Sequence, residues 1–292
     1  MLERTASPLL TVRLFLTEIR IEHTLFALPF AYVGALLAAH GVPALRQLVW
    51  ITLAVLGART AAMSANRYFD REIDARNPRT ARRALVRGAL PPAVMLWGIA
   101  LGLVLLVVAA AELGPLCLAL LPLAAVGIVV YPFCKRFTWA THFVLGAVDG
   151  FAPLGAYIAV SGTITAASLA LFLAVTLWVA GFDIIYALMD RDVDVAQRIR
   201  SIPARFGERS GRLLPIGLHG AMLLLLASAG LLSEAHPLYY LGVGLVALLI
   251  WYEHRLLGRS SDVFSLNERV FNANMLFSLA FLVTTAAAAV QP

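Results

Sequence analysis

The chain has 292 residues, of which 61% are hydrophobic and only 14% are charged, and its mean hydropathy is +0.83. Charged residues make up about 25% of a typical soluble globular domain. The composition therefore excludes that class and indicates an integral membrane protein. Lysine and arginine outnumber aspartate and glutamate by 23 to 17. We attribute this excess to membrane topology and expect no nucleic-acid partner.

The N-terminal segment, residues 1–23, mixes charged and apolar residues and has no unbroken apolar core of the kind that a cleaved signal needs. We predict that it lies at the membrane interface. After it, apolar windows long enough to cross a hydrocarbon core of about 30 Å recur along the whole chain. The predicted spans are 24–43, 47–68, 89–111, 114–134, 140–160, 167–189, 213–232, 237–253 and 270–290.

These windows predict helices, because lipid offers the backbone no hydrogen bonds and the windows show no period-two alternation. We expect an all-α fold, a polytopic membrane protein of one domain over residues 1–292. Cys117 and Cys134 lie at the two ends of one predicted span, roughly 25 Å apart at the helical rise, which is too far for a disulfide.

The positive charges sort to one side of the membrane. Nine crossings place 21 of the 23 basic residues on the side where the chain starts, leaving Arg46 on the other side and Arg59 inside the second span. Because basic loops stay in the cytoplasm, we predict that the N-terminus and the site face the cytoplasm and that the C-terminus lies outside.

Two similar acidic sequences stand at the cytoplasmic ends of the second and sixth spans. The first is N-R-Y-F-D-R-E-I-D, from Asn66 to Asp74, and the second is D-R-D-V-D, from Asp190 to Asp194. Their cores align 120 residues apart, and four spans separate them. This spacing predicts a parallel internal repeat of four helices.

Residues four apart lie on one face of a helix, so Asn66, Asp70 and Asp74 form one stripe and Asp190 and Asp194 form another. Stacked like charges at a membrane boundary need compensating cations. Hard oxygen ligands suit Mg²⁺, which takes the rest of its shell from water and substrate phosphates. We predict that these five residues bind Mg²⁺ and that the four aspartates are catalytic. The alternative is that the acids pair with neighbouring arginines.

Arg59 lies inside the second span, seven residues before Asn66 and on the same stripe. An intramembrane arginine usually faces the bundle interior. We therefore predict that it binds an anion below the metal site. The alternative is an ion pair with Asp149 or Asp183, two acids that also lie in apolar stretches.

Arginine-rich sequences follow both stripes, in the predicted cytoplasmic loops 69–88 and 190–212. Their arginines, Arg71 and Arg79 among them, either clamp a diphosphate or act only as topology signals. Tyr131 and Lys135, on the same side, add an aromatic face and a point charge, although Tyr131 also suits an interface belt. A diphosphate site beside a lipid-embedded central cavity indicates a polyprenyl diphosphate, whose cleavage would release an allylic cation.

The chain resembles the UbiA superfamily of intramembrane prenyltransferases. The positions that match its motifs are Asn66, Asp70, Asp74, Asp190, Asp194, Arg59, Tyr131 and Lys135. Arg67 stands at the second position of the family's first motif, which is usually an aspartate. The resemblance implies nine helices and Mg²⁺-dependent transfer of a prenyl group.

Residues 21–30 and 201–207 are similar to those of bacterial members that prenylate 4-hydroxybenzoate or a naphthoate in ubiquinone or menaquinone biosynthesis. The implied partners are polyprenyl diphosphate, a hydroxylated aromatic acid and the lipid bilayer, and the implied location is a bacterial inner membrane. Two alternatives are a different acceptor, such as haem, chlorophyll or an ether lipid, and, from another class, a secondary transporter.

Overall fold

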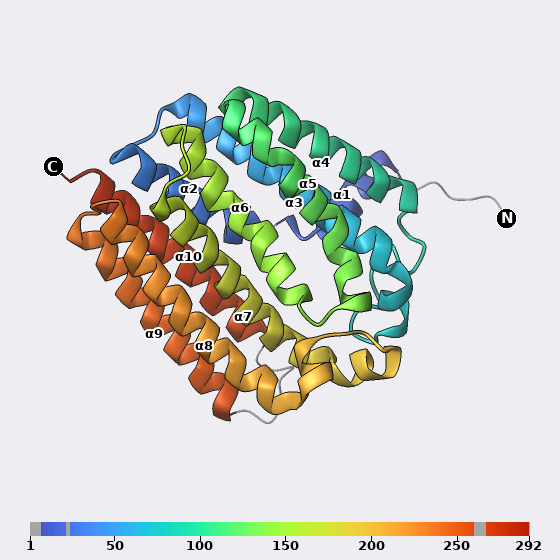
Figure 1. Ribbon diagram of the computed structural model, residues 1–292. Helices are drawn as coiled ribbons and strands as arrows, with labels where there is room; N and C mark the ends of the chain where they lie inside the picture. The colour runs from blue at the N-terminus through green and yellow to red at the C-terminus, as the bar shows by residue number, and fades with distance from the viewer. Residues whose placement is uncertain (1–6, 22–23, 260–266, 292) are drawn as a thin grey trace.

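A computed structural model describes residues 7–21, 24–259 and 267–291. These ranges contain ten helices: α1 Pro8–Glu18, α2 Thr24–Ala39, α3 Leu45–Arg76, α4 Pro92–Leu113, α5 Pro115–Phe137, α6 Thr141–Ser161, α7 Ala166–Gln197, α8 Ile202–Leu232, α9 Pro237–Arg259 and α10 Asn267–Ala289. They form one bundle, in which α8 to α10 lie along one side, α3 to α5 lie along the other, and α6 and α7 lie between them (Figure 1).

Eight of the helices are long and apolar enough to cross a membrane, which confirms the all-α polytopic architecture. The first predicted span corresponds to α2, whose 16 residues reach only about 24 Å at the helical rise. The count of nine crossings therefore stays a prediction. Part of the predicted interfacial segment forms α1, while residues 1–6 and 22–23 lie outside the described residues.

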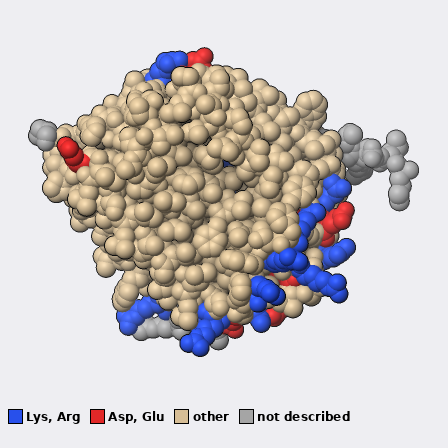
Figure 2. Space-filling model, viewed as in Figure 1, with Lys and Arg blue, Asp and Glu red and all other residues tan. Residues whose placement is uncertain are grey.

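Charged side chains gather mainly along one edge of the bundle, where α3, α5 and α7 end (Figures 1 and 2). Most of the remaining surface in this view carries no charged side chains. This distribution agrees with the sorting of basic residues to one side of the membrane.

Glycines let the helices that carry the acidic stripes approach their neighbours closely. A Cβ on Gly57 of α3 would lie 2.7 Å from the carbonyl oxygen of Gly102 on α4, and a Cβ on Gly146 of α6 would collide with the carbonyl of Thr176 on α7. Small residues at such contacts are typical of helix packing in membranes. They fix α3 against α4 and α6 against α7.

An aromatic cluster anchors α7 in the core. The ring of Trp178 lies 4.7 Å from those of Phe30 on α2 and Phe277 on α10, measured between centroids. All three side chains are almost fully buried. Aromatic pairs in this geometry stabilise a core beyond their buried area, so α7 is held firmly below the end that carries Asp190.

Both motif helices run further than the predicted spans. Each has 32 residues, and they continue to Arg76 and Gln197. Of the stretches expected as loops, 190–212 is therefore mostly helical, in α7 and α8, whereas 69–88 is helical only as far as Arg76 and continues in turns. The stripes therefore lie on regular helix. Pro78 disfavours a helical conformation at Asn77, the residue before it, and so ends α3. α7 ends at Gln197, and the next residue, Arg198, has its backbone in the left-handed region, with φ 56°.

Candidate active site

The first stripe places Asp70 beside Lys135. The Asp70 side chain is 2% exposed, and its Oδ2 accepts hydrogen bonds from Lys135 Nζ at 2.6 Å and from Asn66 Nδ2 at 2.8 Å. Arg136 lies 3.8 Å from Oδ1, which is buried and accepts no hydrogen bond from any residue that the structure describes. The structure thus brings together Asn66, Asp70 and Lys135, three of the predicted site residues.

The connection after α3 folds back over the same stripe. Arg83 donates a hydrogen bond to the carboxylate of Asp74. The Thr80 hydroxyl donates to the backbone carbonyl of Asp74 at 2.8 Å. The end of α3 is therefore covered by residues from its own loop.

The same connection also reaches the second stripe, on α7. The Asp190 carboxylate accepts hydrogen bonds from Asn77 Nδ2 at 2.9 Å and from Arg79 Nε and Nη2 at 3.0 and 2.5 Å. Burial alone would lower the pKa of Arg79, but its hydrogen bond to Asp190 and the negative charge there raise it above the ordinary value. A charged Arg79, from the connection that follows the first motif, thus binds an aspartate of the second motif.

Asp194 and the start of α8 are held by a short polar chain. Ser201 Oγ donates to Asp194 at 2.8 Å, and the backbone N–H of Ile202 donates to His142 Nε2 at 3.2 Å. His142 Nδ1 lies 2.7 Å from Asp183. Because a backbone N–H only donates, Nε2 is the acceptor and Nδ1 carries the proton toward Asp183. The neutral imidazole therefore ties α6, α7 and α8 together.

Four residues of these contacts were not predicted from the sequence: His142, Ser201, Asn77 and Arg83. Asp183 was expected only as a possible partner of Arg59. An acid inside an apolar span was the one signal that pointed to this chain of hydrogen bonds. The other four residues offered none, because their partners lie on other helices or beyond a turn.

Arg67 contacts Asn66, one of the predicted metal ligands, and also the end of α1. It is 8% exposed, and its Nε donates to the backbone carbonyl of Glu18, at the end of α1, at 3.0 Å. Its Nη1 donates to Asn66 Oδ1 at 3.0 Å. Where the family usually has an aspartate, this chain uses an arginine to hold α1 against α3 and to orient Asn66.

The other predicted binding residues have different surroundings. The Arg71 guanidinium stacks over the Tyr68 ring at 5.0 Å and, in the described part of the chain, pairs with none of the four aspartates. Tyr131 lies within electrostatic range of Asp183 and Asp70.

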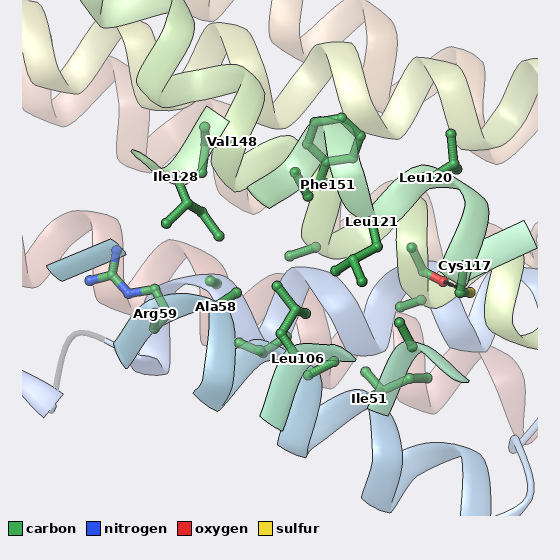
Figure 3. Close-up of a pocket in the computed structure, with 18 of the residues that line it drawn as sticks. Ile51, Ala58, Arg59, Leu106, Cys117, Leu120, Leu121, Ile128, Val148 and Phe151 are labelled. Carbon is green, nitrogen blue, oxygen red and sulfur yellow. Dashed lines mark hydrogen bonds between the residues drawn. The ribbon is translucent and has the colours of Figure 1, made fainter. Parts of the chain in front are cut away.

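Arg59 lies on the wall of an apolar cavity of about 120 Å³ between α3, α4, α5 and α6. Arg59 is at one end of it, and Ile51 and Cys117 are at the other (Figure 3). Arg59 Nη1 lies 3.9 Å from Asp149 Oδ1, while its Nε is buried with no hydrogen-bond partner among the described residues. The ion pair with Asp149 that the sequence left open is thus present, but it is long.

The contacts of the four aspartates bear on both alternatives for the acidic stripes, pairing with arginines and binding of Mg²⁺. Asp74 and Asp190 pair with arginines, as the simpler alternative proposed. Among the described residues, no three acid, histidine or cysteine side chains form a metal cluster. Mg²⁺, however, often takes only one or two protein carboxylates and completes its shell with phosphates and water. Within the described ranges, Asp70 Oδ1 accepts no hydrogen bond and Asp194 has only the neutral Ser201 as a side-chain hydrogen-bond partner, and both fit that chemistry.

The fold and the site define a polytopic, all-helical membrane protein with a polar cluster above an apolar cavity. Residues 27–289 match the family model described as the UbiA prenyltransferase family. A 4-hydroxybenzoate octaprenyltransferase from Alkalilimnicola ehrlichii is 36% identical over 257 residues, which cover 85% of this chain and 84% of that protein. The chain belongs to the UbiA prenyltransferase family, as its motifs indicated.

Solved structures agree with this assignment. The apo structure of a UbiA homologue from Aeropyrum pernix K1 is 33% identical, with a TM-score of 0.79, over 93% of this chain and 98% of that one. A UbiA homologue from Archaeoglobus fulgidus, solved bound to DMAPP and Mg²⁺, shares the fold at 18% identity, with a TM-score of 0.68, over 94% of this chain and 98% of that one. The chain is accordingly a prenyltransferase.

Proposed function

We propose that this enzyme uses Mg²⁺ to transfer a polyprenyl group from polyprenyl diphosphate to a ring carbon of a hydroxylated aromatic acid. 4-Hydroxybenzoate is the first candidate acceptor, because the Alkalilimnicola relative is named for it. The observation that carries the proposal is the contact of Asn77 and Arg79, from the connection that follows the first aspartate stripe, with Asp190 of the second stripe, above an apolar cavity that Arg59 lines. The bound DMAPP and Mg²⁺ of the Archaeoglobus homologue support the donor and the metal.

Asp70 and Asp74 from α3, with Asp190 and Asp194 from α7, would hold the metal. Bound there, Mg²⁺ would supply positive charge that stabilises the leaving diphosphate. The cations that now pair with these carboxylates form the rest of the diphosphate site. Once metal neutralises the aspartates, they would be free to donate to phosphate oxygens, and arginine does so through two hydrogen bonds at once. These cations are Arg79, Arg83 and Lys135.

The apolar cavity suits the first part of the prenyl chain. Its wall begins at Ala62, about 12 Å from Asp70 along α3, and continues past Arg59 to Ile51. A cavity of about 120 Å³ is smaller than a typical ligand pocket of roughly 300–1,000 Å³. A long chain would therefore continue beyond it into lipid. The apolar wall keeps water from an allylic cation.

Arg59 would hold the acceptor. It lies eleven residues before Asp70, roughly 16 Å along the helix, which separates it from the diphosphate end. Its long contact with Asp149 and its unpartnered Nε leave donors for a carboxylate, which an arginine binds through two hydrogen bonds. Tyr131, between the two ends, would present its ring to the cation.

The reaction that follows exchanges one bond for another. The C–O bond of the allylic diphosphate breaks, and its electron pair leaves with the diphosphate. The ring carbon beside the acceptor hydroxyl, made electron-rich by that group, forms the new C–C bond. Loss of the ring proton then restores aromaticity.

The test is conversion in membranes that contain the protein, with labelled polyprenyl diphosphate, Mg²⁺ and a panel of acceptors. The panel contains 4-hydroxybenzoate, a hydroxynaphthoate, haem, a chlorophyll precursor and a glyceryl ether. We expect diphosphate release and a lipid-soluble aromatic product with the first or second acceptor. A product only with one of the other three would contradict the acceptor class, and uptake of substrate without conversion would indicate a transporter.

A matched pair of variants isolates the second motif. Asp190→Asn removes a carboxylate of the proposed metal site, and we expect a loss of at least about 100-fold in kcat, since metal stabilisation of a leaving group amounts to several kcal/mol. Asp192→Asn is the control, because its side chain is 93% exposed and, in the part of the chain that the structure describes, pairs only with the adjacent Arg191. Equal activity in both variants would contradict the role of Asp190.

A further inference from the structure

A second depression, of about 530 Å³, lies outside the aspartate site, between the α5–α6 connection and the end of α7 with the start of α8. Three of the residues that line it are arginines, Arg198, Arg200 and Arg205. None of its lining residues is acidic, and none is one of the four motif aspartates. The sequence left open whether the arginines of this stretch clamp a diphosphate or act only as topology signals; in the structure these three line a separate pocket.

Two of these arginines carry uncompensated charge. Arg200 Nη1 donates to the backbone carbonyl of Phe137 at 2.6 Å. The side chains of Arg198 and Arg205 make no hydrogen bond or ion pair with any residue that the structure describes, and both are exposed. In this they differ from Arg79 and Arg83, whose charges are taken up by aspartates. A pocket with this charge suits an anion with several oxygen acceptors.

Exposed aromatic side chains lie beside the arginines. Phe137 and Trp139 line the pocket and are 56% and 44% exposed, and Phe206 is 51% exposed. The rings of Trp139 and Phe206 meet edge to face at 5.4 Å. Aromatic residues gather where a membrane protein passes from hydrocarbon to head groups. Their presence at the ends of four candidate spans indicates a ligand with an apolar part as well as a negative one.

We propose that this pocket binds an anionic phospholipid of the cytoplasmic leaflet. Its phosphate would lie against Arg198 and Arg205, and an acyl chain would run along Trp139 and Phe206. Basic pockets at the cytoplasmic ends of membrane helices bind anionic head groups in this way, because that leaflet carries a negative surface potential.

The lipid would act on the active site through the connection between α7 and α8. This connection, residues 198–201, is bonded to site residues on both sides. The Ser201 hydroxyl donates to Asp194, and the backbone N–H of Arg200 donates to the carbonyl of Lys135 at 2.7 Å. A lipid held by Arg198 and Arg205 would therefore steady one proposed metal ligand and the lysine that pairs with Asp70. This consequence for activity rests on the proposed function, whereas the binding itself does not.

Lipid retention on the purified protein tests the binding. In a neutral detergent, native mass spectrometry would count phosphatidylglycerol and phosphatidylcholine retained by the wild type, and we expect at least fivefold preference for phosphatidylglycerol. The double variant Arg198→Gln, Arg205→Gln should lose that preference at least fivefold. Both side chains are unpaired in the structure, so the variant removes no contact that holds the fold.

The matched control is the double variant Arg87→Gln, Arg209→Gln. It makes the same change in charge at two exposed arginines that do not line the pocket and whose side chains have no bonding partner among the described residues. Its retention should stay within twofold of the wild type. Equal losses in the two double variants would overturn the proposal. So would displacement of the lipid by an equal concentration of phosphate or pyrophosphate, which would mark an anion site with no need of a lipid.

Activity in vesicles gives a second readout. Prenyl transfer by the wild type should be at least threefold faster in phosphatidylglycerol than in phosphatidylcholine, and the Arg198, Arg205 double variant should equal the wild type in phosphatidylcholine but lose the enhancement. An equal loss of activity in both lipids would overturn the proposal by placing these arginines in the substrate site. If the wild type transferred no prenyl group in either lipid, the proposed function would fail, and lipid retention would still decide the binding.

Discussion

The ion pair between Asp70 and Lys135 allows the metal site to be tested without an activity assay. The carboxylate is 2% exposed, and Lys135, 25% exposed, approaches it to 2.6 Å. In Lys135→Gln the nearest remaining cation is Arg136, at 3.8 Å. Loss of one partner from a buried pair costs about 3–5 kcal/mol. Since Lys135 is partly exposed, we expect the lower end, about 3 kcal/mol.

Magnesium should reverse this loss, because an ion at Asp70 supplies the charge that lysine no longer provides. At a concentration of 100 times Kd, a ligand of the native state stabilises it by about 2.7 kcal/mol. The double variant Asp70→Asn, Lys135→Gln removes both charges of the pair, so neither is left buried without its partner. We therefore expect it to be more stable than the sum of the two single changes predicts, and to gain much less from Mg²⁺ than Lys135→Gln alone.

The measurement is thermal unfolding of the purified protein in detergent, with and without Mg²⁺. A change of 3 kcal/mol corresponds to roughly 6–12 °C for a chain of this size class. Arg46→Gln is the control, since it breaks an exposed pair with Glu112 far from the site and should cost at most about 1 kcal/mol with no response to Mg²⁺. Equal stabilisation of Lys135→Gln and of the double variant by Mg²⁺ would refute a metal site at Asp70.

The sequence predicted those features that depend on local periodicity. Long apolar windows predict helices with little ambiguity, because lipid leaves the backbone no other way to satisfy its hydrogen bonds. Asp70 and Asp74 are four residues apart, as are Asp190 and Asp194. Helix geometry alone therefore predicts that each pair lies on one face of its helix. Family membership followed from the same residues, since the two motifs are specific in combination.

Contacts between helices were beyond the sequence. Arg79 and Asp190 are 111 residues apart, and they are partners because the connection after α3 reaches the end of α7. Arg67 is the clearest example of a contact between helices that the sequence does not predict. One residue along from Asn66, it points about 100° around the helix, toward the end of α1, where the backbone carbonyl of Glu18 accepts its hydrogen bond. The motif predicted a missing ligand there, whereas the side chain is a buried structural contact.

Two further predictions separate the acceptor end of the cavity from the prenyl end. Arg59→Ala should raise the KM for the aromatic acid by roughly 10–100-fold, the value of one hydrogen bond to a charged group, and leave the KM for the prenyl diphosphate unchanged in steady-state kinetics. The reverse pattern would assign Arg59 to the diphosphate. Ala54→Phe places a ring inside a cavity of about 120 Å³, so kcat/KM should fall more for long prenyl donors than for short ones, as measured by mass spectrometry of the products. Ala119→Phe makes the same change at an exposed position of α5 and should not discriminate. Equal losses with short and long donors in Ala54→Phe would mean that the chain does not occupy this cavity.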